Sequence, residues 1–558
     1  MKRKSLWIGI GTLTAFLAII AALIFIDPFG WRILDRLQGN SDLALTAMPS
    51  ETAVYLGVDL LQFISDDWQA IFAQFSAADG GDAQNDFEQS LNEQLGISFS
   101  EDVQPWVGPS FGVALLDVQA DLTGNVTSVQ WVAAAETRNR ADTDAFLAKL
   151  AAGWAKMTGE TAVSETYQNI NITLFNSETP ANQLAFGRDD NLLLIGSDLF
   201  AIQSALDARK DVSLANTSGF TELEPTLVAP WRNGGRLATL YLNTPRLGRL
   251  QSALPLSFGS FVLPALPTNG VLGTAVSVSL HEGNIQLDVN TAYNLTQLGT
   301  AQTQLFQTQS ADQTTINSLP VNTLLYANGE GIDQLWSLYR EAFINETSDS
   351  DFEDSMALLK QQFGLNPNSD LFPFLDGTTT LALVPSDIAE GGSVPQLAQA
   401  QLDAVLAIDS SDGAILSQNI ADFSQRFDAT IGTVGETAVN GFTNYTLETA
   451  LLSDFMLHYS VGHDQFIIAT SPNALLTTQS TETATPFANS ATFQTAWSAF
   501  PTDMTPGLYV DVAGLLTHLQ TVGQETSGSW NAITQISGAS QTTDSQTHQR
   551  IIFFLPTD

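Results

Sequence analysis

Two acidic stretches of the chain concentrate oxygen ligands of the kind that Ca²⁺ prefers. The first, DGGDAQNDFE, covers Asp79 to Glu88, and the second, NETSDSDFED, covers Asn345 to Asp354. Neither stretch has the glycine at the sixth position or the terminal glutamate of an EF-hand. Acidic, serine-rich connections are usually solvated loops, so a calcium site and a plain solvated loop both stay open. The candidate ligands are Asp79, Asp82, Asp86, Asp349, Asp351 and Glu353.

Residue types that other reactions need are scarce. The chain has no cysteine, which excludes disulfides, thiolate nucleophiles, iron–sulfur clusters and Cys-ligated zinc. It contains no HExxH helix motif, Walker loop or dinucleotide-binding glycine motif. Of the five histidines, His458 and His463 are predicted to be solvated residues at or near strand ends. We therefore expect no catalytic and no cofactor-binding residues, although two carboxylates of a hydrolase can meet from any distance along a chain.

The charge balance limits the partners. The chain has 558 residues, 44% of them hydrophobic, which indicates a folded protein of more than one domain. It carries 20 basic and 59 acidic residues, a net charge of −39, so its surface repels nucleic acid. Residues 250–558 hold 4 basic and 30 acidic residues. We expect this distal half to favour cationic partners or ions.

The amino-terminal residues predict a membrane anchor. Three basic residues precede an uncharged apolar run from Leu6 to Ile26, which is long enough to cross a hydrocarbon core of about 30 Å. The positive-inside rule places residues 1–5 in the cytoplasm and the bulk of the chain outside the plasma membrane. A signal peptide that is cleaved late is the alternative. Residues 27–43 are predicted to form an amphipathic juxtamembrane segment followed by a linker.

The rest of the chain is predicted to be a tandem duplication. The pattern P-x-x-T-x-x-Y occurs at Pro49–Tyr55 and again at Pro320–Tyr326. A second pattern, D-x-x-P-[WF], begins at Asp102 and again at Asp370, and further landmarks recur in the same order. Self-similarity of this kind indicates repeated structural units. We expect homologous halves at 44–300 and 316–558, joined by a linker at 301–315.

Hydrophobic periodicity predicts an α+β fold in which each half is a mostly antiparallel sheet with helices packed on one face. In the first half, the pattern predicts a hairpin that turns at Glu282 to Asn284. Three polar residues, Asp59, Asn243 and Asp511, each follow a strand and precede a helix-like run. We interpret them as helix N-caps, and a cluster of ligand-binding side chains is the alternative.

The membrane anchor, the P-x-x-T-x-x-Y strand, the W-[VL]-G element at Trp106–Gly108 and the duplicated halves together resemble a family of bacterial extracytoplasmic proteins catalogued only as a domain of unknown function. The resemblance covers nearly all of the exported part. The second half departs from it at Phe374 to Asp376, where the element becomes F-L-D. The resemblance implies membrane tethering and a role in the cell envelope, and it supplies no catalytic residues.

Three functions stay open at this point. The first is a non-enzymatic binding or scaffold protein of the cell envelope with a protein partner. The second is a carrier of a lipid or another apolar ligand, and the third is a hydrolase with dispersed carboxylates. An exposed apolar patch would favour the first, a large apolar cavity the second, and two facing carboxylates in a cleft the third.

Overall fold

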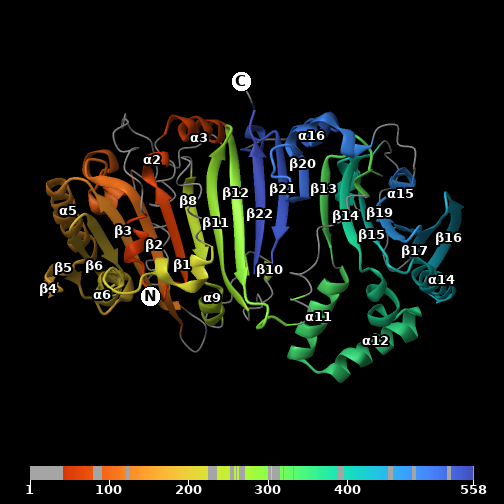
Figure 1. Ribbon diagram of the computed structural model, residues 1–558, viewed down its shortest axis with the longest axis horizontal. Helices are drawn as coiled ribbons and strands as arrows, with labels where there is room; N and C mark the ends of the chain where they lie inside the picture. Colours follow the sequence, from red (N-terminus) through yellow and green to blue (C-terminus); the bar gives the residue numbers. More distant parts are fainter. Residues whose placement is uncertain are drawn as a thin grey trace. The chain divides into compact units, whose positions relative to one another are not determined.

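The computed structural model contains two compact units, one ending at Gln297 and the other beginning at Leu298 (Figure 1). Within the residues it describes, no helix combines the length and the hydropathy needed to cross a membrane. The predicted span at residues 6–26 lies outside the described residues. Those residues are 42–63, 65–79, 89, 91–120, 126–223, 236–251, 257–258, 261–262, 270–299, 303, 315–317, 319–330, 332–386, 395–430, 432–449, 456–479, 486–524, 529–543 and 545–556.

The sheet of unit 1 has ten described strands, and every neighbouring pair is antiparallel. In spatial order they are β4 (Val163–Tyr167), β5 (Ile170–Phe175), β6 (Leu184–Asp189), β7 (Leu192–Gly196), β3 (Val126–Thr137), β2 (Val107–Ala120), β1 (Val54–Asp59), β8 (Arg236–Leu242), β11 (Val271–His281) and β12 (Asn284–Tyr293). Two short strands, β9 (Ser257–Phe258) and β10 (Phe261–Val262), pair with each other.

The sheet of unit 2 also has ten described strands, again antiparallel throughout. Their spatial order is β16 (Gly432–Val439), β17 (Phe442–Thr449), β18 (Met456–Gly462), β19 (Gln465–Ala469), β15 (Leu402–Asp409), β14 (Thr378–Pro385), β13 (Leu325–Glu330), β20 (Thr505–Asp511), β21 (Gln535–Thr542) and β22 (Gln546–Phe554). The predicted antiparallel α+β fold is therefore confirmed.

Helices connect many of these strands, and the following are those that the described residues define from end to end. Those of unit 1 are η2 (Leu45–Ala47), α2 (Leu60–Phe63), α3 (Asp66–Asp79), η3 (Phe99–Val103), α5 (Arg140–Thr158), η4 (Pro180–Asn182), α6 (Leu199–Ala208), η5 (Leu214–Asn216), α7 (Ser218–Thr221) and α9 (Thr244–Gln251). Those of unit 2 are η6 (Thr315–Asn317), α11 (Ile332–Glu346), α12 (Asp349–Phe363), η7 (Pro367–Leu371), η8 (Phe372–Phe374), α13 (Pro395–Gln399), α14 (Gly413–Thr430), α15 (Pro472–Gln479), η9 (Phe487–Asn489), α16 (Ala491–Trp497), α17 (Val512–Thr521) and η10 (Ser529–Ala532).

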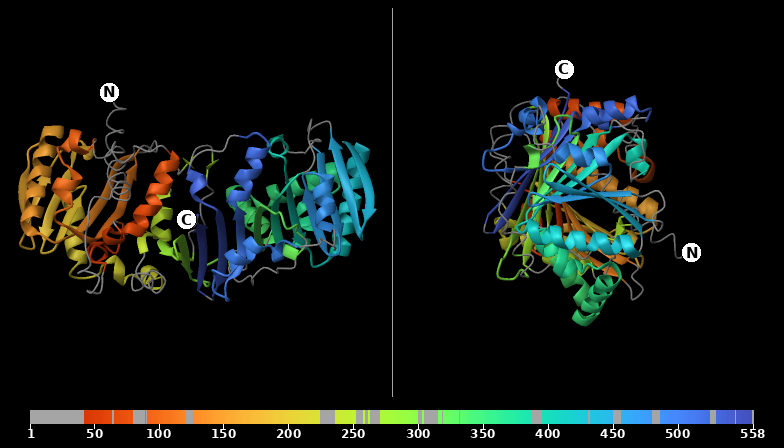
Figure 2. Two further views of the ribbon diagram at one scale, coloured as in Figure 1. Left: turned by 90° about the horizontal axis from the view of Figure 1, so that it is seen from above. Right: turned by 90° about the vertical axis from the view of Figure 1, so that its right-hand side faces the viewer.

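Helices cover both faces of the unit 2 sheet, so the prediction that they pack on one face is wrong. Along β19, Phe466 and Ile468 pack with α14. The alternate residues Ile467 and Ala469 pack with Ala474 and Leu475 of α15. Successive side chains of a strand point to opposite faces, so α14 and α15 lie on opposite sides of β19. Figure 2, right, shows strands of unit 2 between helices on both sides.

The predicted turn and caps are confirmed. Strands β11 and β12 join through Glu282 and Gly283, which have φ angles of 51° and 79°, the left-handed pair that a two-residue hairpin requires. Asp59 Oδ1 accepts the N–H of Gln62 at 3.2 Å, and Asn243 and Asp511 accept the corresponding N–H groups at the starts of α9 and α17. These three side chains therefore satisfy helix amides.

Hydrogen bonds join Asp42 and Ala44, near the first described residues of unit 1, to strands β1 and β2. Tyr55 of β1 donates its hydroxyl to Asp42 Oδ2 at 2.8 Å, and Ser110 of β2 donates to Asp42 Oδ1 at 2.7 Å. Ser110 Oγ in turn accepts the N–H of Ala44 at 2.8 Å. Burial and the neighbouring Asp42 charge raise the pKa of Tyr55 well above its usual value. Asp42, which the sequence places in the linker, thus lies against the sheet.

Candidate functional site

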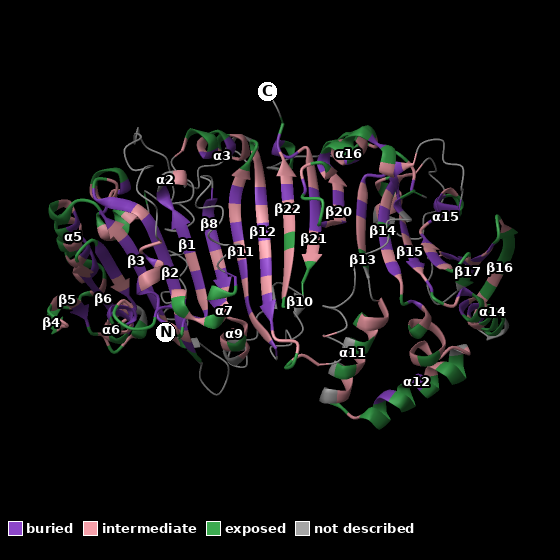
Figure 3. Cartoon of the chain, viewed as in Figure 1, coloured by how far each residue is buried: buried purple, intermediate pink, exposed green. Residues whose placement is uncertain are grey.

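Helices α11 and α12 form a helical hairpin in unit 2, with Thr347 and Ser348 between them. The Ser348 hydroxyl caps α12 by accepting the N–H of Asp351 at 3.2 Å. Gly364 ends the helix with a φ of 76°, a left-handed conformation that glycine adopts readily. Figure 3 shows that much of the outer surface of α12 is exposed.

Aromatic side chains attach the hairpin to the rest of unit 2. The Trp336 ring stacks on Phe372 of η8 with 4.1 Å between ring centroids, and its Nε1 donates to Asn368 Oδ1 at 3.2 Å. Phe352 of α12 is 1% exposed, and its ring lies 5.6 Å from that of Phe343. The inner side of the hairpin is therefore part of a packed core.

Large apolar side chains stand on the outer side of the same hairpin. Leu335 and Tyr339 of α11 are 56% and 54% exposed, and Leu358 of α12 is 52% exposed. Leu335 and Tyr339 lie four residues apart, so they are neighbours on one face of α11. The Tyr339 ring also lies 5.3 Å from Trp336, which extends the buried aromatic layer to the surface. Exposed apolar side chains that lie side by side, as Leu335 and Tyr339 do, mark interaction sites.

The hairpin is strongly acidic. Residues 332–363 include seven acidic and two basic residues. Arg340 lies 2.8 Å from Asp349 and 3.8 Å from Glu353, and Lys360 binds Asp370 of η7 at 3.2 Å. Both cations of the hairpin thus have carboxylate partners, and the remaining carboxylates leave its surface negative.

Three of the predicted calcium ligands lie at the start of α12. Asp349 and Glu353 contact Arg340, and Asp351 accepts a hydrogen bond from the Ser348 hydroxyl at 2.6 Å. The interpretation of this stretch as a loop is wrong, because α12 begins at Asp349. Asp349 and Asp351 lie in the first turn of α12, where the positive end of the helix dipole favours carboxylates.

The other predicted calcium ligands are placed less fully. Asp79 is the last residue of α3, whereas Asp82 and Asp86 lie outside the described residues. Across the described ranges, no group of three or more His, Asp or Glu residues is arranged to hold a metal ion. The calcium site stays a prediction.

Sequence reasoning missed Arg340 and the exposed apolar residues of α11. A signal for the latter was present, because the apolar residues of α11 exceed one helical stripe. Trp336 and Phe343 recur at the spacing of a buried face, while Leu335 and Tyr339 form a second pair beside it. A helix with more apolar residues than one face can bury indicates that a second surface needs a partner.

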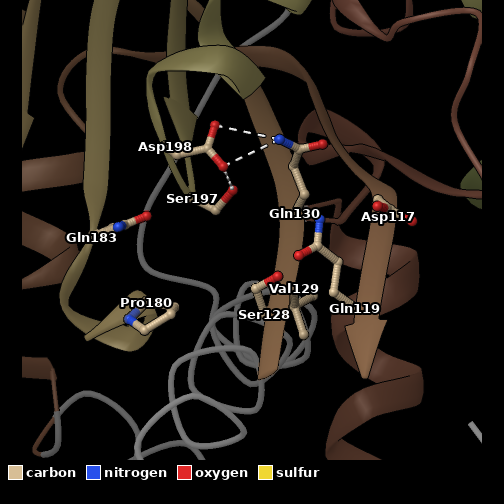
Figure 4. A pocket seen from close by; sticks show the side chains of 9 residues that line it. All are labelled: Asp117, Gln119, Ser128, Val129, Gln130, Pro180, Gln183, Ser197 and Asp198. Atoms are coloured by element: carbon tan, nitrogen blue, oxygen red, sulfur yellow. Dashed lines mark hydrogen bonds between the residues drawn. The ribbon is translucent and has the colours of Figure 1, made fainter. Parts of the chain in front are cut away.

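A small hollow in unit 1 is the other candidate site (Figure 4). Its volume is about 80 Å³, well below the roughly 300–1,000 Å³ of ligand pockets, and it is lined largely by polar residues. It therefore does not provide the large apolar cavity of a carrier. The lining residues are Asp117, Gln119, Ser128, Val129, Gln130, Pro180, Gln183, Ser197 and Asp198.

Asp198, one of the two carboxylates that line this hollow, already has several hydrogen-bond partners. Asp198 caps α6 by accepting the N–H of Ala201 at 2.8 Å. It also accepts hydrogen bonds from Gln130 Nε2 and Ser197 Oγ, each at 3.2 Å (Figure 4). The position and type of Asp198 follow from helix capping, so its presence in the hollow is explained without a catalytic role.

His458 is not a solvated strand-end residue, and that prediction is wrong. It lies within β18, is 2% exposed, and its Nδ1 is 3.1 Å from Thr446 Oγ1. Burial lowers the pKa of His458, while Asp403 and Glu448 act in the opposite direction. His463 does lie in the exposed turn that joins β18 to β19, with a φ of 49°.

The two D-x-x-P patterns occupy similar local structures. Asp102 accepts the N–H of Ser98 at 2.7 Å and the ammonium of Lys149 at 2.5 Å. Asp370 accepts the N–H of Asn366 at 2.9 Å and binds Lys360. Partial burial opposes ionisation, but these hydrogen bonds outweigh it and the pKa of each carboxyl is lowered. Both aspartates hold a short helical turn to a neighbouring helix.

The chain matches, over residues 62–555, the model of a protein family described as "Protein of unknown function (DUF3352)". Solved structures of TP0453 are also similar. Crystal form III shares 11% identity over 47% of this chain and 84% of that chain, with a TM-score of 0.24. Crystal form IV shares 11% identity over 45% and 80%, with a TM-score of 0.23. Scores this low carry no argument about function. No curated protein matches the chain.

Proposed function

The chain belongs to this family of proteins of unknown function, and we propose that it is a membrane-anchored, non-enzymatic binding or scaffold protein of the cell envelope. In this proposal residues 6–26 span the plasma membrane, residues 1–5 are cytoplasmic, and both units lie outside. The α11–α12 hairpin is the surface that holds a protein partner.

The observation that carries the proposal is the outer side of the hairpin. Leu335, Tyr339 and Leu358 are each more than half exposed, although the same helices bury Phe352 almost completely. Covering an apolar side chain contributes roughly 1.5–3 kcal/mol when burial is complete. A partner that covers these three residues thus gains binding energy that the chain alone leaves unused.

Charge defines the partner's chemistry. The seven acidic and two basic residues of positions 332–363 lie within a distal half that holds 30 acidic and 4 basic residues. An acidic partner would be repelled, and so would anionic lipid. The partner surface that fits is a protein segment with apolar side chains flanked by lysine or arginine, because it satisfies the hairpin's apolar residues and its charge together.

We also propose that the units arose by tandem duplication. The ten strands of each unit follow one connection order, with β1 to β8 matching β13 to β20 in sequence along the chain. Tyr55 pairs with Tyr241 in unit 1, and Tyr326 pairs with Tyr509 in unit 2.

The other two functions gain no support among the described residues. The hollow of Figure 4 is small and polar, which does not suit an apolar ligand. Asp198 in that hollow caps α6, which does not suit an acid–base pair. The binding role is the one for which a specific surface exists.

Site-specific photocrosslinking in the native membrane tests the proposal. The full chain carries p-benzoylphenylalanine at Leu335, at Tyr339, or at Phe200 of α6 as the control, because Phe200 is 63% exposed. We expect one protein adduct from positions 335 and 339 and none from position 200. Mass spectrometry of the adduct should place the crosslink in a basic, apolar segment.

Charge reversal provides the second arm. Asp354→Lys and Glu341→Lys each place a cation on the exposed hairpin surface and should lower the adduct yield. Asp211→Lys, at an exposed position of unit 1, is the matched control and should leave the yield unchanged. Absence of an adduct at both hairpin positions, or a yield that responds equally to all three substitutions, would refute the proposal.

A further inference from the structure

Helix α15 of unit 2 and helix α6 of unit 1 hold equivalent places in their sheets. Each begins directly after the strand that precedes it, β19 or β7, and its cap lies two residues beyond the end of that strand. Asp198 caps α6 by accepting the N–H of Ala201 at 2.8 Å, and Ser471 Oγ caps α15 by accepting the N–H of Ala474 at 3.1 Å. The residues that join each helix to its sheet can therefore be compared position by position.

Strand pairing aligns the positions beneath the two helices. Ala185 of β6 pairs with the last residue of β7, and His458 of β18 pairs with the last residue of β19. In the next strands, Leu174 of β5 pairs with Ala185, and Thr446 of β17 pairs with His458. Residues two positions earlier in β5 and β17 lie on the same faces. The equivalent pairs are thus Ala185 and His458, Leu174 and Thr446, and Ile172 and Asn444.

The contact between helix and sheet is apolar in unit 1 and polar in unit 2. Leu206 of α6, eight residues after its cap, packs in one apolar cluster with the β5 and β6 residues. At the equivalent place in α15, Gln479 Nε2 donates to Asn444 Oδ1 at 2.7 Å. At the other end of α15, the Ser471 hydroxyl donates to Asp403 Oδ2 at 2.9 Å. Hydrogen bonds thus hold both ends of α15, with apolar packing in the middle of the helix.

His458 is the titratable group within this contact. It is 2% exposed, its Nδ1 is 3.1 Å from Thr446 Oγ1, and its Nε2 has no hydrogen-bond partner within the described part of the chain. Two carboxylates share this face of the sheet, Asp403 of β15 and Glu448 of β17, whereas α15 and β19 contribute no titratable side chain. Both carboxylates favour a protonated ring, but burial has the larger effect and lowers the pKa of His458.

We propose that α15 detaches from the sheet in acid and that protonation of His458 drives the detachment. Above about pH 6.5, the pKa of an unfolded histidine, the buried ring is neutral and α15 stays attached. Below that pH, a detached α15 lets water reach the ring, which then binds a proton that the buried ring resists. Unit 1 has an alanine at this position, so α6 should not respond. The proposal does not depend on the partner surface of the α11–α12 hairpin.

The polar contact is the reason that α15 and not the whole sheet should respond. Water can replace the hydrogen bonds of Gln479 and Ser471 when the helix leaves, so each contributes little net stability. Apolar packing of the kind that holds α6 is lost outright when its side chains meet water. Segments that open locally are those with the fewest buried apolar contacts, and α15 has exchanged several of these for polar ones.

Cysteine accessibility in the full chain tests the proposal, because the natural chain has no cysteine. Ala474→Cys places a thiol on α15 at a position that is 3% exposed, and Ala201→Cys, at the equivalent position of α6, is the matched control at 0% exposed. Dipyridyl disulfide, which reacts with thiols in acid as well as at neutral pH, is the probe. Leu476→Cys, at a position of α15 that is 41% exposed, gives the rate of an accessible thiol at each pH, and each buried rate is divided by it.

We expect the normalised rate at Ala474→Cys to rise several-fold between about pH 7.5 and about pH 5. The upper limit is about 30-fold, for a detached ring with a pKa of about 6.5 and an attached ring that binds no proton. The rate at Ala201→Cys should not rise. Adding His458→Gln to Ala474→Cys should abolish the rise, because glutamine does not titrate.

If Ala474→Cys does not fold by circular dichroism, Thr478→Cys takes its place, at a position of α15 that is 8% exposed. An unchanged normalised rate at α15 overturns the proposal. A rise of equal size at Ala201→Cys overturns it too, because acid then loosens the chain as a whole. A rise that persists with His458→Gln shows that another group titrates and is equally fatal to the proposal.

Discussion

Phe352 and Leu358 lie on the same helix, α12. Truncating Phe352 to alanine should destabilise unit 2, whereas truncating Leu358 should leave its stability nearly unchanged. Phe352 is 1% exposed, with the Phe343 ring at 5.6 Å and the Arg340 guanidinium at 5.4 Å from its ring. Truncating a buried phenylalanine to alanine costs about 3–5 kcal/mol. We expect about 3 kcal/mol for Phe352→Ala, because Tyr339 and Arg340 are close to the surface and can settle partly into the space.

Leu358 is 52% exposed, so Leu358→Ala should change the stability of unit 2 by less than about 0.5 kcal/mol. The assay is hydrogen exchange of α12 amides followed by mass spectrometry. A loss of 3 kcal/mol speeds exchange by about two powers of ten, at 1.4 kcal/mol for each factor of ten. Leu358→Ala should leave exchange unchanged while it lowers the crosslinking yield at Leu335. Equal acceleration in both variants would show that the hairpin does not have the buried and exposed sides described above.

Three further predictions concern titration and the backbone. The pKa of His458 is lowered in the folded state. The contribution of His458 to the stability of unit 2 should therefore be complete above the pKa of an unfolded histidine, about 6.5, and be lost as the pH falls below it. The urea midpoint of the natural chain should drop on acidification, and His458→Gln should remove that drop. The pKa of Asp370 is also lowered, so its contribution to the stability of unit 2 is present above about pH 4 and lost as the pH falls further. In the same unfolding assay, Asp370→Asn should destabilise unit 2 at neutral pH and have no effect in strong acid. Gly283→Val should cost about 1–2 kcal/mol at its φ of 79° in thermal unfolding, whereas a valine that leaves Tm unchanged would contradict the assigned turn.

Local patterns predicted the elements of this fold well where one physical rule decided the outcome. The hairpin at Glu282 and Gly283 follows from a glycine, which adopts left-handed backbone readily, in a two-residue loop between alternating strands. The caps at Asp59, Asn243 and Asp511 follow from unsatisfied helix amides. In each case the partners are within a few residues along the chain, so the sequence contains all the information needed.

Predictions failed where the outcome depends on residues far apart in sequence. The burial of His458 is set by Thr446 and the strands on either side of it, and nothing in its own segment indicates that. The two-sided burial of β19 had a signal in its continuous apolar run, but the helices that cover it come from separate parts of the chain.

The attachment of Asp42 has a mechanical consequence. Its carboxylate is bound by side chains of β1 and β2, and β1 is paired along its length with a strand on each side. A chain held at residues 6–26, as proposed, would transmit tension from the membrane to the middle of the unit 1 sheet and not to an edge strand. Tension applied there loads many backbone hydrogen bonds together, so forced unfolding of unit 1 from its amino-terminal side should need a larger force than peeling from an edge strand.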